Sequence, residues 1–291
     1  MKLFRYLPAL LLLLAAGTAR ASEDLGEFVL HHIVNSKVWH PIPGLPGITF
    51  PAWHVLGVDV SLTLHSAMML LAGALMLILI LPAARRKTAA HDKSGLAPAG
   101  RFAHAIEALV VFIRDEVVTP NLGEKHGRKW MPFFLTVFFF ILTLNLVGLV
   151  PGFGAATSNI NFTATFAVMI FILFNLSGII HNGPVHYFAN LVPKGLPFWL
   201  LPLIAVIEVV GLFTKAVALA LRLFANLTAG HALIFSLLGL IIVFKSHLAA
   251  LPLVPFTLFI YLIEILVAFL QAYIFTLLAG LFIGQAVHQE H

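Results

Sequence analysis

Five long apolar runs dominate the sequence, and polar stretches separate them. They predict helices over residues 60–82, 131–150, 161–180, 199–244 and 255–287. About 20 predominantly apolar residues in a helix are enough to cross the hydrocarbon core of a bilayer. The pattern therefore predicts an all-α membrane protein with about five membrane-embedded helices.

The last two runs are too long to stand upright in a membrane. No proline interrupts residues 203–244, and a helix of that length would extend about 63 Å at 1.5 Å per residue. The hydrocarbon core is only about 30 Å thick. These two helices must tilt steeply, bend or lie partly along the membrane plane, and the polar turn between them makes them a hairpin.

Residues 101–118 follow a different pattern. Apolar side chains recur there at steps of three and four residues, at Phe102, Ile106, Leu109, Val110 and Ile113. The charged residues of this stretch mostly lie off that stripe. We therefore expect an amphipathic helix that lies at the cytoplasmic interface of the membrane.

The N-terminus has the features of a secretory signal peptide. Basic residues precede a short apolar stretch, and a small-residue site follows it at Ala19-Arg20-Ala21. We expect residues 1–21 to be a cleaved signal peptide, with an uncleaved anchor as the alternative. Residues 22–59 are rich in proline and glycine, so they are expected to form a loop-rich extracytoplasmic segment. Residues 60–291 are then a single membrane domain.

Composition and charge agree with a membrane location. The chain is 60% hydrophobic and 10% charged, whereas soluble domains carry about 25% charged residues. Basic clusters at 85–87 and 125–129 flank apolar runs, as they do on the cytoplasmic side of membrane spans. A nucleic-acid partner is therefore not expected. The alternation of crossings places the N-terminus outside and the C-terminus in the cytoplasm.

Four charged residues interrupt the two longest runs, namely Glu208, Lys215, Arg222 and Glu264. An ionised group at the centre of a membrane helix costs on the order of 2.5–3.5 kcal/mol, so such residues usually have a function. The first three are seven residues apart, which places them on one face of the helix. Asn226 continues that face, whereas His231 lies about 180° away from Arg222. On the last helix, Glu264 and Gln271 also share a face.

Structural roles explain some of these residues equally well. Glu208 could pair with Lys215, and the long Lys215 side chain could reach the interface. Asn226 and Gln271 could be ordinary interhelical hydrogen-bond partners, and His231 could be a satisfied core histidine. Arg222 is harder to explain structurally, because no acidic residue lies one helical turn away from it. Small side chains surround it, at Ala216, Ala218, Ala220, Ala225, Ala229 and Gly230, so another backbone could approach this buried charge closely.

One segment resembles a known family. The run Leu221-Arg222-Leu223-Phe224-Ala225-Asn226-Leu227-Thr228-Ala229-Gly230-His231 is similar to subunit a of F-type ATP synthases, where such a segment carries an essential arginine. The resemblance continues through the run from Glu264 to Phe275 and takes in Asn145 within Leu144-Asn145-Leu146. It covers roughly residues 60–291.

This resemblance implies a function and a role for each candidate residue. The chain would be a non-catalytic stator subunit of a bacterial inner-membrane ATP synthase, which carries ions, with protons expected, to a rotating ring of c subunits. Arg222 would face the ring carboxylates, with Asn226 and Gln271 beside it. His231 and Glu264 would line the outer half-channel, and Glu208 the inner one. The partners would be the c ring, the peripheral-stalk b subunits and lipid, with no cofactor and no metal.

Two positions depart from the pattern of some bacterial members of the family. Those members carry an acid at the position of His231 and a histidine at that of Glu264, so the pair is exchanged here. Gly148 stands where some relatives have an acid, which puts that contribution to the outer half-channel in doubt. Lys215 and Asn145 are further candidates for the ion path.

Other function classes fit less well. A secondary transporter with a buried arginine is the alternative, but transporters usually show inverted repeats and helices broken by glycine or proline. A haem-binding subunit would need paired axial histidines at membrane depth. The absence of cysteine excludes disulfides and thiolate metal ligands. The sequence leaves proton and sodium coupling open, because the ring's carboxylate site largely decides the ion.

Overall fold

The computed structural model describes most of the membrane domain and short parts of the segment before it. The described residues are 36–39, 47–51, 54–55, 58–59, 61–84, 100–150, 152–189, 197–244 and 247–287. The expected signal peptide, the basic cluster at 85–87 and the C-terminal residues 288–291 lie outside these ranges. Among the described helices, five are long and apolar enough to cross a membrane.

Short strand pairs precede the helices. Strand β1 (Val38–Trp39) pairs antiparallel with β2 (Ile48–Thr49), and β3 (His54–Val55) pairs antiparallel with β4 (Val58–Asp59). The β1–β2 hairpin is held against the membrane domain, because the Trp39 indole Nε1 donates to the Gly152 carbonyl at 2.7 Å. The Trp39 ring also packs edge-on against Phe153.

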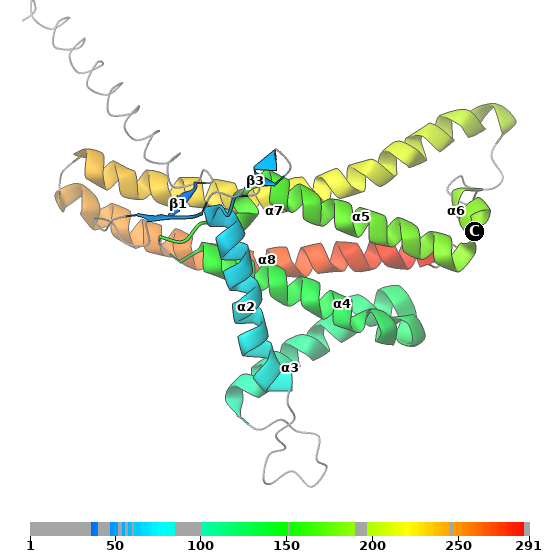
Figure 1. Cartoon of the computed structure of the whole chain (residues 1–291), viewed down its shortest axis with the longest axis horizontal. Helices are drawn as coiled ribbons and strands as arrows, with labels where there is room; N and C mark the ends of the chain where they lie inside the picture. The colour runs from blue at the N-terminus through cyan, green and yellow to red at the C-terminus, as the bar shows by residue number, and fades with distance from the viewer. Residues whose placement is uncertain are drawn as a thin grey trace, which may run out of the picture.

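Helix α2 (Leu64–Ala84) is the first long helix, and it crosses the others steeply in Figure 1. Its 21 residues extend about 31 Å, which matches the thickness of the hydrocarbon core. One face packs on helix α4 through Met68 and Ala72, which are fully buried. The opposite face is exposed and apolar, as a lipid-facing surface should be.

The amphipathic stretch and the second span form one bent unit. Helix α3 (Arg101–Ile113) runs into a π-helical turn, η2 (Arg114–Val118), and then into α4 (Thr119–Gly148). The chain reverses inside α4 at Gly123, whose φ of +68° is one that glycine adopts readily. Hydropathy predicts a span from 131, but helix begins at Thr119, because hydropathy detects the apolar part of a helix and not its polar first turns.

The third span is followed by a short helix. A 3₁₀ turn, η3 (Ala156–Ser158), leads to α5 (Ile160–Asn182), which the Asn159 side chain caps by accepting from the Asn161 N–H. Helix α6 (Pro184–Ala189) follows, and the sequence pattern did not predict it. Its Tyr187 is buried and donates to Asn175 Oδ1 at 2.9 Å, and burial raises the pKa of the Tyr187 hydroxyl.

The last two helices form the predicted hairpin. After a 3₁₀ turn, η4 (Phe198–Leu200), helix α7 (Leu201–Phe244) runs the length of the molecule and α8 (His247–Val287) returns beside it. Both lie across the direction of α2 in Figure 1, which agrees with the steep tilt predicted from their length. Helix α8 begins eight residues before the predicted start at 255 and contains Pro252 and Pro255. A proline removes only its own N–H, and membrane helices tolerate that loss.

Two glycines of α8 let the bent unit approach closely. Gly280 and Gly284 are four residues apart, so they share one face. A Cβ on Gly280 would lie 3.1 Å from a Val117 methyl group, and one on Gly284 would overlap the backbone carbonyl of Asn121. The η2–α4 segment therefore packs into a groove of small residues, a common way for membrane helices to associate.

Replacing Gly284 with alanine is expected to destabilise the fold by about 1–3 kcal/mol, because the added methyl group meets backbone and cannot be accommodated by a side-chain rotation. Thermal unfolding of the purified subunit in detergent would measure the loss. Gly73→Ala is the matched control, since its Cβ would make only an ordinary contact, 3.8 Å from the Phe140 ring. Equal thermal stability of the two variants would contradict this account of the α8 groove.

Candidate functional site

Arg222 lies near the middle of α7 and is exposed on the surface of the chain. It forms no hydrogen bond or ion pair with any residue in the described parts of the chain. Leu223 and Leu227, on the other side of the helix, are fully buried. The sequence predicts an arginine buried at membrane depth, so what covers the guanidinium there lies outside the described parts of this chain.

Small side chains surround Arg222 on this open face. Ala218, Ala225 and Ala229 are all exposed, at −4, +3 and +7 from the arginine. Leu221 beside it is 49% exposed. We call these residues together with Arg222 the arginine face. A protruding cation among alanines favours close contact with a partner helix.

Lys215 does not pair with Glu208 in the described structure. Its Nζ instead donates to Gln285 Oε1 of α8 at 3.3 Å and lies 5.3 Å from the centroid of the Phe282 ring. Glu208 and Lys215 are both half-buried, whereas Arg222 is exposed. Gln285 was missed by the sequence interpretation. The spacing of polar residues on the last helix could have indicated it, because Gln285 lies 14 residues after Gln271, which lies seven residues after Glu264.

His231 lies on the buried side of α7, opposite Arg222, as the spacing predicts. Its Nδ1 is 2.9 Å from the Leu227 carbonyl oxygen, and its Nε2 is 2.9 Å from the Gly148 carbonyl oxygen. A neutral imidazole has only one N–H to donate. A neutral His231 therefore donates to one of these two carbonyls at a time, and its tautomer decides which one.

Glu264 of α8 faces Gly230 of α7, the residue before His231. It is only 7% exposed, and its carboxylate packs directly on Gly230, where a Cβ would overlap it. It also interacts electrostatically with His231. The structure thus brings the exchanged acid and histidine together as a buried pair across the α7–α8 hairpin.

The end of α4 completes this cluster through its backbone. Gly148 accepts from His231, and Leu149 accepts from the Tyr261 hydroxyl of α8. A Cβ on Gly148 would lie 3.1 Å from Ala155, so an acidic side chain has little room there. Gly148 therefore contacts His231 through its backbone carbonyl, which the absence of an acidic side chain at this position does not affect.

Asn145 lies one turn before Gly148 and is fully buried. Its Nδ2 donates to the Ala268 carbonyl of α8 at 3.4 Å. Gln271 is also buried, and Asn226 is half-buried. Neither amide makes a side-chain hydrogen bond to a described residue, so the structure does not support a role for them as interhelical hydrogen-bond partners.

Several buried polar atoms around the pair lack a partner among the described residues. They are Asn145 Oδ1, Thr157 Oγ1, Thr228 Oγ1 and Glu264 Oε2. They come from α4, η3, α7 and α8, which meet around His231 and Glu264. Buried polar atoms are almost always hydrogen-bonded to protein or water. Water is the usual partner of such atoms where the protein supplies none.

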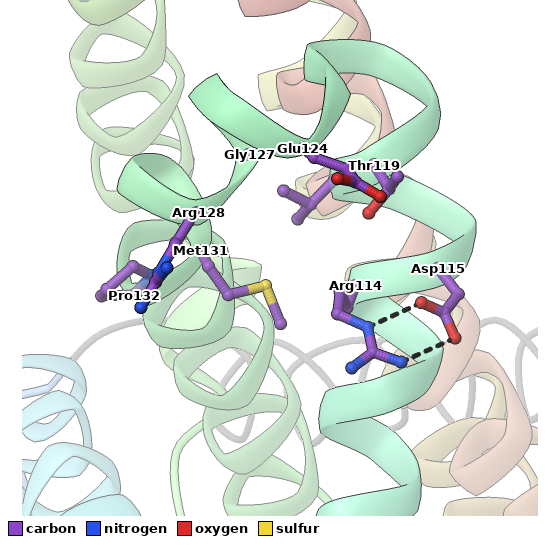
Figure 2. A pocket seen from close by; sticks show the side chains of 9 residues that line it. Arg114, Asp115, Thr119, Glu124, Gly127, Arg128, Met131 and Pro132 are labelled. Atoms are coloured by element: carbon purple, nitrogen blue, oxygen red, sulfur yellow. Dashed lines mark hydrogen bonds and ion pairs between the residues drawn. The ribbon is translucent and has the colours of Figure 1, made fainter.

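A separate cavity of about 640 Å³ opens at the bend between α3 and α4 (Figure 2). Arg114, Asp115, Glu124, Arg128 and Met131 are among its lining residues. The Arg114 guanidinium donates to both Asp115 carboxylate oxygens, at 2.7 and 3.1 Å. None of the sequence-predicted site residues lines this cavity. In the described parts of the chain, no group of three or more metal-ligating side chains occurs.

Comparison with known proteins shows the family of this chain. Residues 66–284 match the family model described as ATP synthase A chain. This chain belongs to the ATP synthase subunit a family. The match spans α2 to α8 and includes Arg222, His231 and Glu264. It leaves out residues 1–65 and the last seven residues of the chain.

Curated subunit a proteins are similar over most of this subunit a chain. The ATP synthase subunit a of Chloroherpeton thalassium is 46% identical over 264 residues, which cover 90% of this chain and 77% of the relative. That of Chlorobium phaeobacteroides strain DSM 266 is 43% identical, covering 95% and 79%. That of Myxococcus xanthus is 42% identical, covering 80% and 75%. The protein is therefore a multi-pass membrane subunit of an ATP synthase complex.

Proposed function

We propose that this subunit a carries protons to and from a rotating ring of c subunits, with Arg222 facing the ring carboxylates. The observation that carries the proposal is the arginine face. Arg222 has no partner within the described chain, lies among exposed alanines, and sits in the middle of an apolar helix. An unpaired guanidinium at that depth is costly, so a carboxylate from another subunit is the partner that its charge requires.

The chemistry follows from the properties of a guanidinium. It stays protonated in proteins and carries a delocalised positive charge. A ring carboxylate that arrives opposite Arg222 ionises, because a nearby opposite charge lowers its pKa. It releases its proton on one side of the arginine. It takes up a proton on the other side before it returns to lipid, where a bare carboxylate is costly.

The two sides of Arg222 differ in a way that supports two half-channels. Toward the loop after α4 lie the buried Glu264–His231 pair and the unpartnered polar atoms, which suit an outer half-channel. Toward the C-terminal end of α8 lie Glu208 and the Lys215–Gln285 contact, which suit an inner one. Arg222 stands between them, and its fixed charge repels a proton that would pass directly from one to the other.

The same proposal gives the orientation and location of the subunit. In it, the N-terminal segment lies outside the cytoplasm and the C-terminus inside, and the membrane is a bacterial inner membrane. The subunit is non-catalytic by itself, and peripheral-stalk b subunits hold it against the ring. The continuous helix α7 speaks against the secondary transporter, whose binding sites usually lie at broken helices.

Crosslinking tests whether a ring subunit covers the arginine face. The chain has no cysteine, so single cysteines need no background removal. In the assembled complex, Ala225→Cys labelled with a photoreactive maleimide is expected to crosslink to the small ring subunit. Ile78→Cys is the control, because Ile78 is 65% exposed but lies on α2. The proposal is contradicted if Ala225→Cys gives no ring adduct while labelling is complete.

A further inference from the structure

A second buried histidine lies beside the Glu264–His231 pair. His65 is in the first turn of α2 and is only 6% exposed. Its ring packs on the loop after α4, with Cδ2 3.1 Å from where a Cβ on Gly154 would be. It is close enough to His231 for the two imidazoles to interact electrostatically. His65 lies just outside the stretch that matches the family model.

The packing below His65 closes this site toward the middle of the membrane. Met68 and Ala72 follow it on the same face of α2, and both are fully buried. They pack with Leu144, Val147 and Ala156 in one apolar cluster. A proton on His65 therefore has no polar route along α2 toward the middle of the membrane.

The surroundings above His65 are polar. Thr63 and Ser66 share a hydrogen bond of 2.8 Å, and the Leu64 N–H donates to the Ser36 carbonyl at 2.8 Å. The β1–β2 hairpin, which begins two residues after Ser36, lies on this side of the molecule. His65 thus lies between the extracytoplasmic segment and the buried pair.

We propose that His65 is a proton-relay residue of the outer half-channel, between the extracytoplasmic water and the His231–Glu264 pair. An imidazole can accept a proton at one ring nitrogen and release another from the second. Protonated His65 becomes neutral as neutral His231 becomes protonated, directly or through water, and His231 then passes the proton to the Glu264 carboxylate. Among the described neighbours, α4 and η3 present no titratable side chain toward His65. His231 interacts electrostatically with His65, and Glu264 lies behind it. Lys37 is the charged residue of the β1 segment, next to Ser36, whose carbonyl accepts from the Leu64 N–H.

This inference rests on the proposed function, and its test separates the two. In purified complexes in liposomes, with the pH of each compartment set independently, His65→Gln is expected to slow proton-driven ATP synthesis roughly tenfold. It is also expected to change the dependence of the rate on outer pH while the dependence on inner pH is kept. His65→Glu restores a titratable group, so its rate is expected to recover toward lower outer pH. His104→Gln is the control, because His104 is an exposed histidine on α3.

Two results would overturn the relay. One is a His65→Gln rate and outer-pH profile equal to those of the unmodified complex. The other is an equal slowing of the Gln and Glu variants with an unchanged profile, which would make His65 a packing residue. Ion-driven synthesis that survives Arg222→Lys would instead refute the proposed function itself, whatever the His65 variants do.

Discussion

Replacing Arg222 with lysine is expected to abolish ion-driven ATP synthesis, with a loss of at least about a hundredfold. The two side chains carry the same formal charge, but lysine deprotonates readily when it is desolvated, whereas a guanidinium does not. Lysine also presents a compact charge on a flexible stem in place of a planar fork. A ring carboxylate would then meet a group that can lose its charge, and it would no longer be driven to release its proton.

The alanine variant separates the two roles of the arginine. Arg222→Ala removes the attraction for the ring carboxylate, so synthesis is lost as well. It also removes the fixed positive charge between the two proposed half-channels, so the passive proton leak through the complex is expected to rise. Synthesis and leak can both be measured in liposomes that contain the purified complex.

The control for the lysine variant makes the same chemical change elsewhere. Arg101 is exposed at the start of α3, so Arg101→Lys is expected to leave synthesis near the unmodified rate. Robust synthesis by the Arg222→Lys complex would refute the assignment of Arg222 as the group that ionises the ring. Poor assembly of the complex would also abolish synthesis. Arg222 is exposed on the chain, so its replacement should not disturb the fold.

Hydropathy and spacing predict much of this molecule because the bilayer imposes strict rules on a chain. An apolar run must be helical to satisfy its backbone, so the five long helices and the hairpin can be read from the sequence. A charge in such a run is costly, so the pattern of residues is enough to single out Arg222. The rotation of successive residues around the helix axis also follows from the sequence, and it predicts that His231 lies opposite Arg222.

What depends on contacts between helices could not be predicted in this way. The partner of Lys215 is Gln285, which depends on how α7 and α8 are aligned. The backbone carbonyl of Gly148 contacts His231, and spacing gives no information on backbone acceptors. His65 is joined to the site only by the packing of α2 on the loop after α4. The polar residues 119–130 are helical although their hydropathy is low, because Gly123 lets the chain turn back without leaving helical structure on either side.

Replacing Gly230 with alanine is expected to slow proton-driven synthesis roughly ten- to hundredfold without loss of the fold. The Glu264 carboxylate occupies the space that the new methyl group would fill. A carboxylate at the end of a flexible side chain can rotate away, so the helix should remain packed, and alanine favours helix over glycine by about 1 kcal/mol. The displaced carboxylate would no longer lie against His231, and the proposed outer half-channel would lose its acid–histidine pair.

Gly211→Ala is the matched control for this variant. Gly211 lies on the same helix, and no heavy atom approaches within 4 Å of where its Cβ would be. The control should therefore keep both its assembly and its rate. Since both variants gain the same methyl group, a difference between them reports the Glu264 site and not helix propensity. If Gly230→Ala assembles and synthesises ATP at the Gly211→Ala rate, close contact between Glu264 and residue 230 has no part in proton transfer.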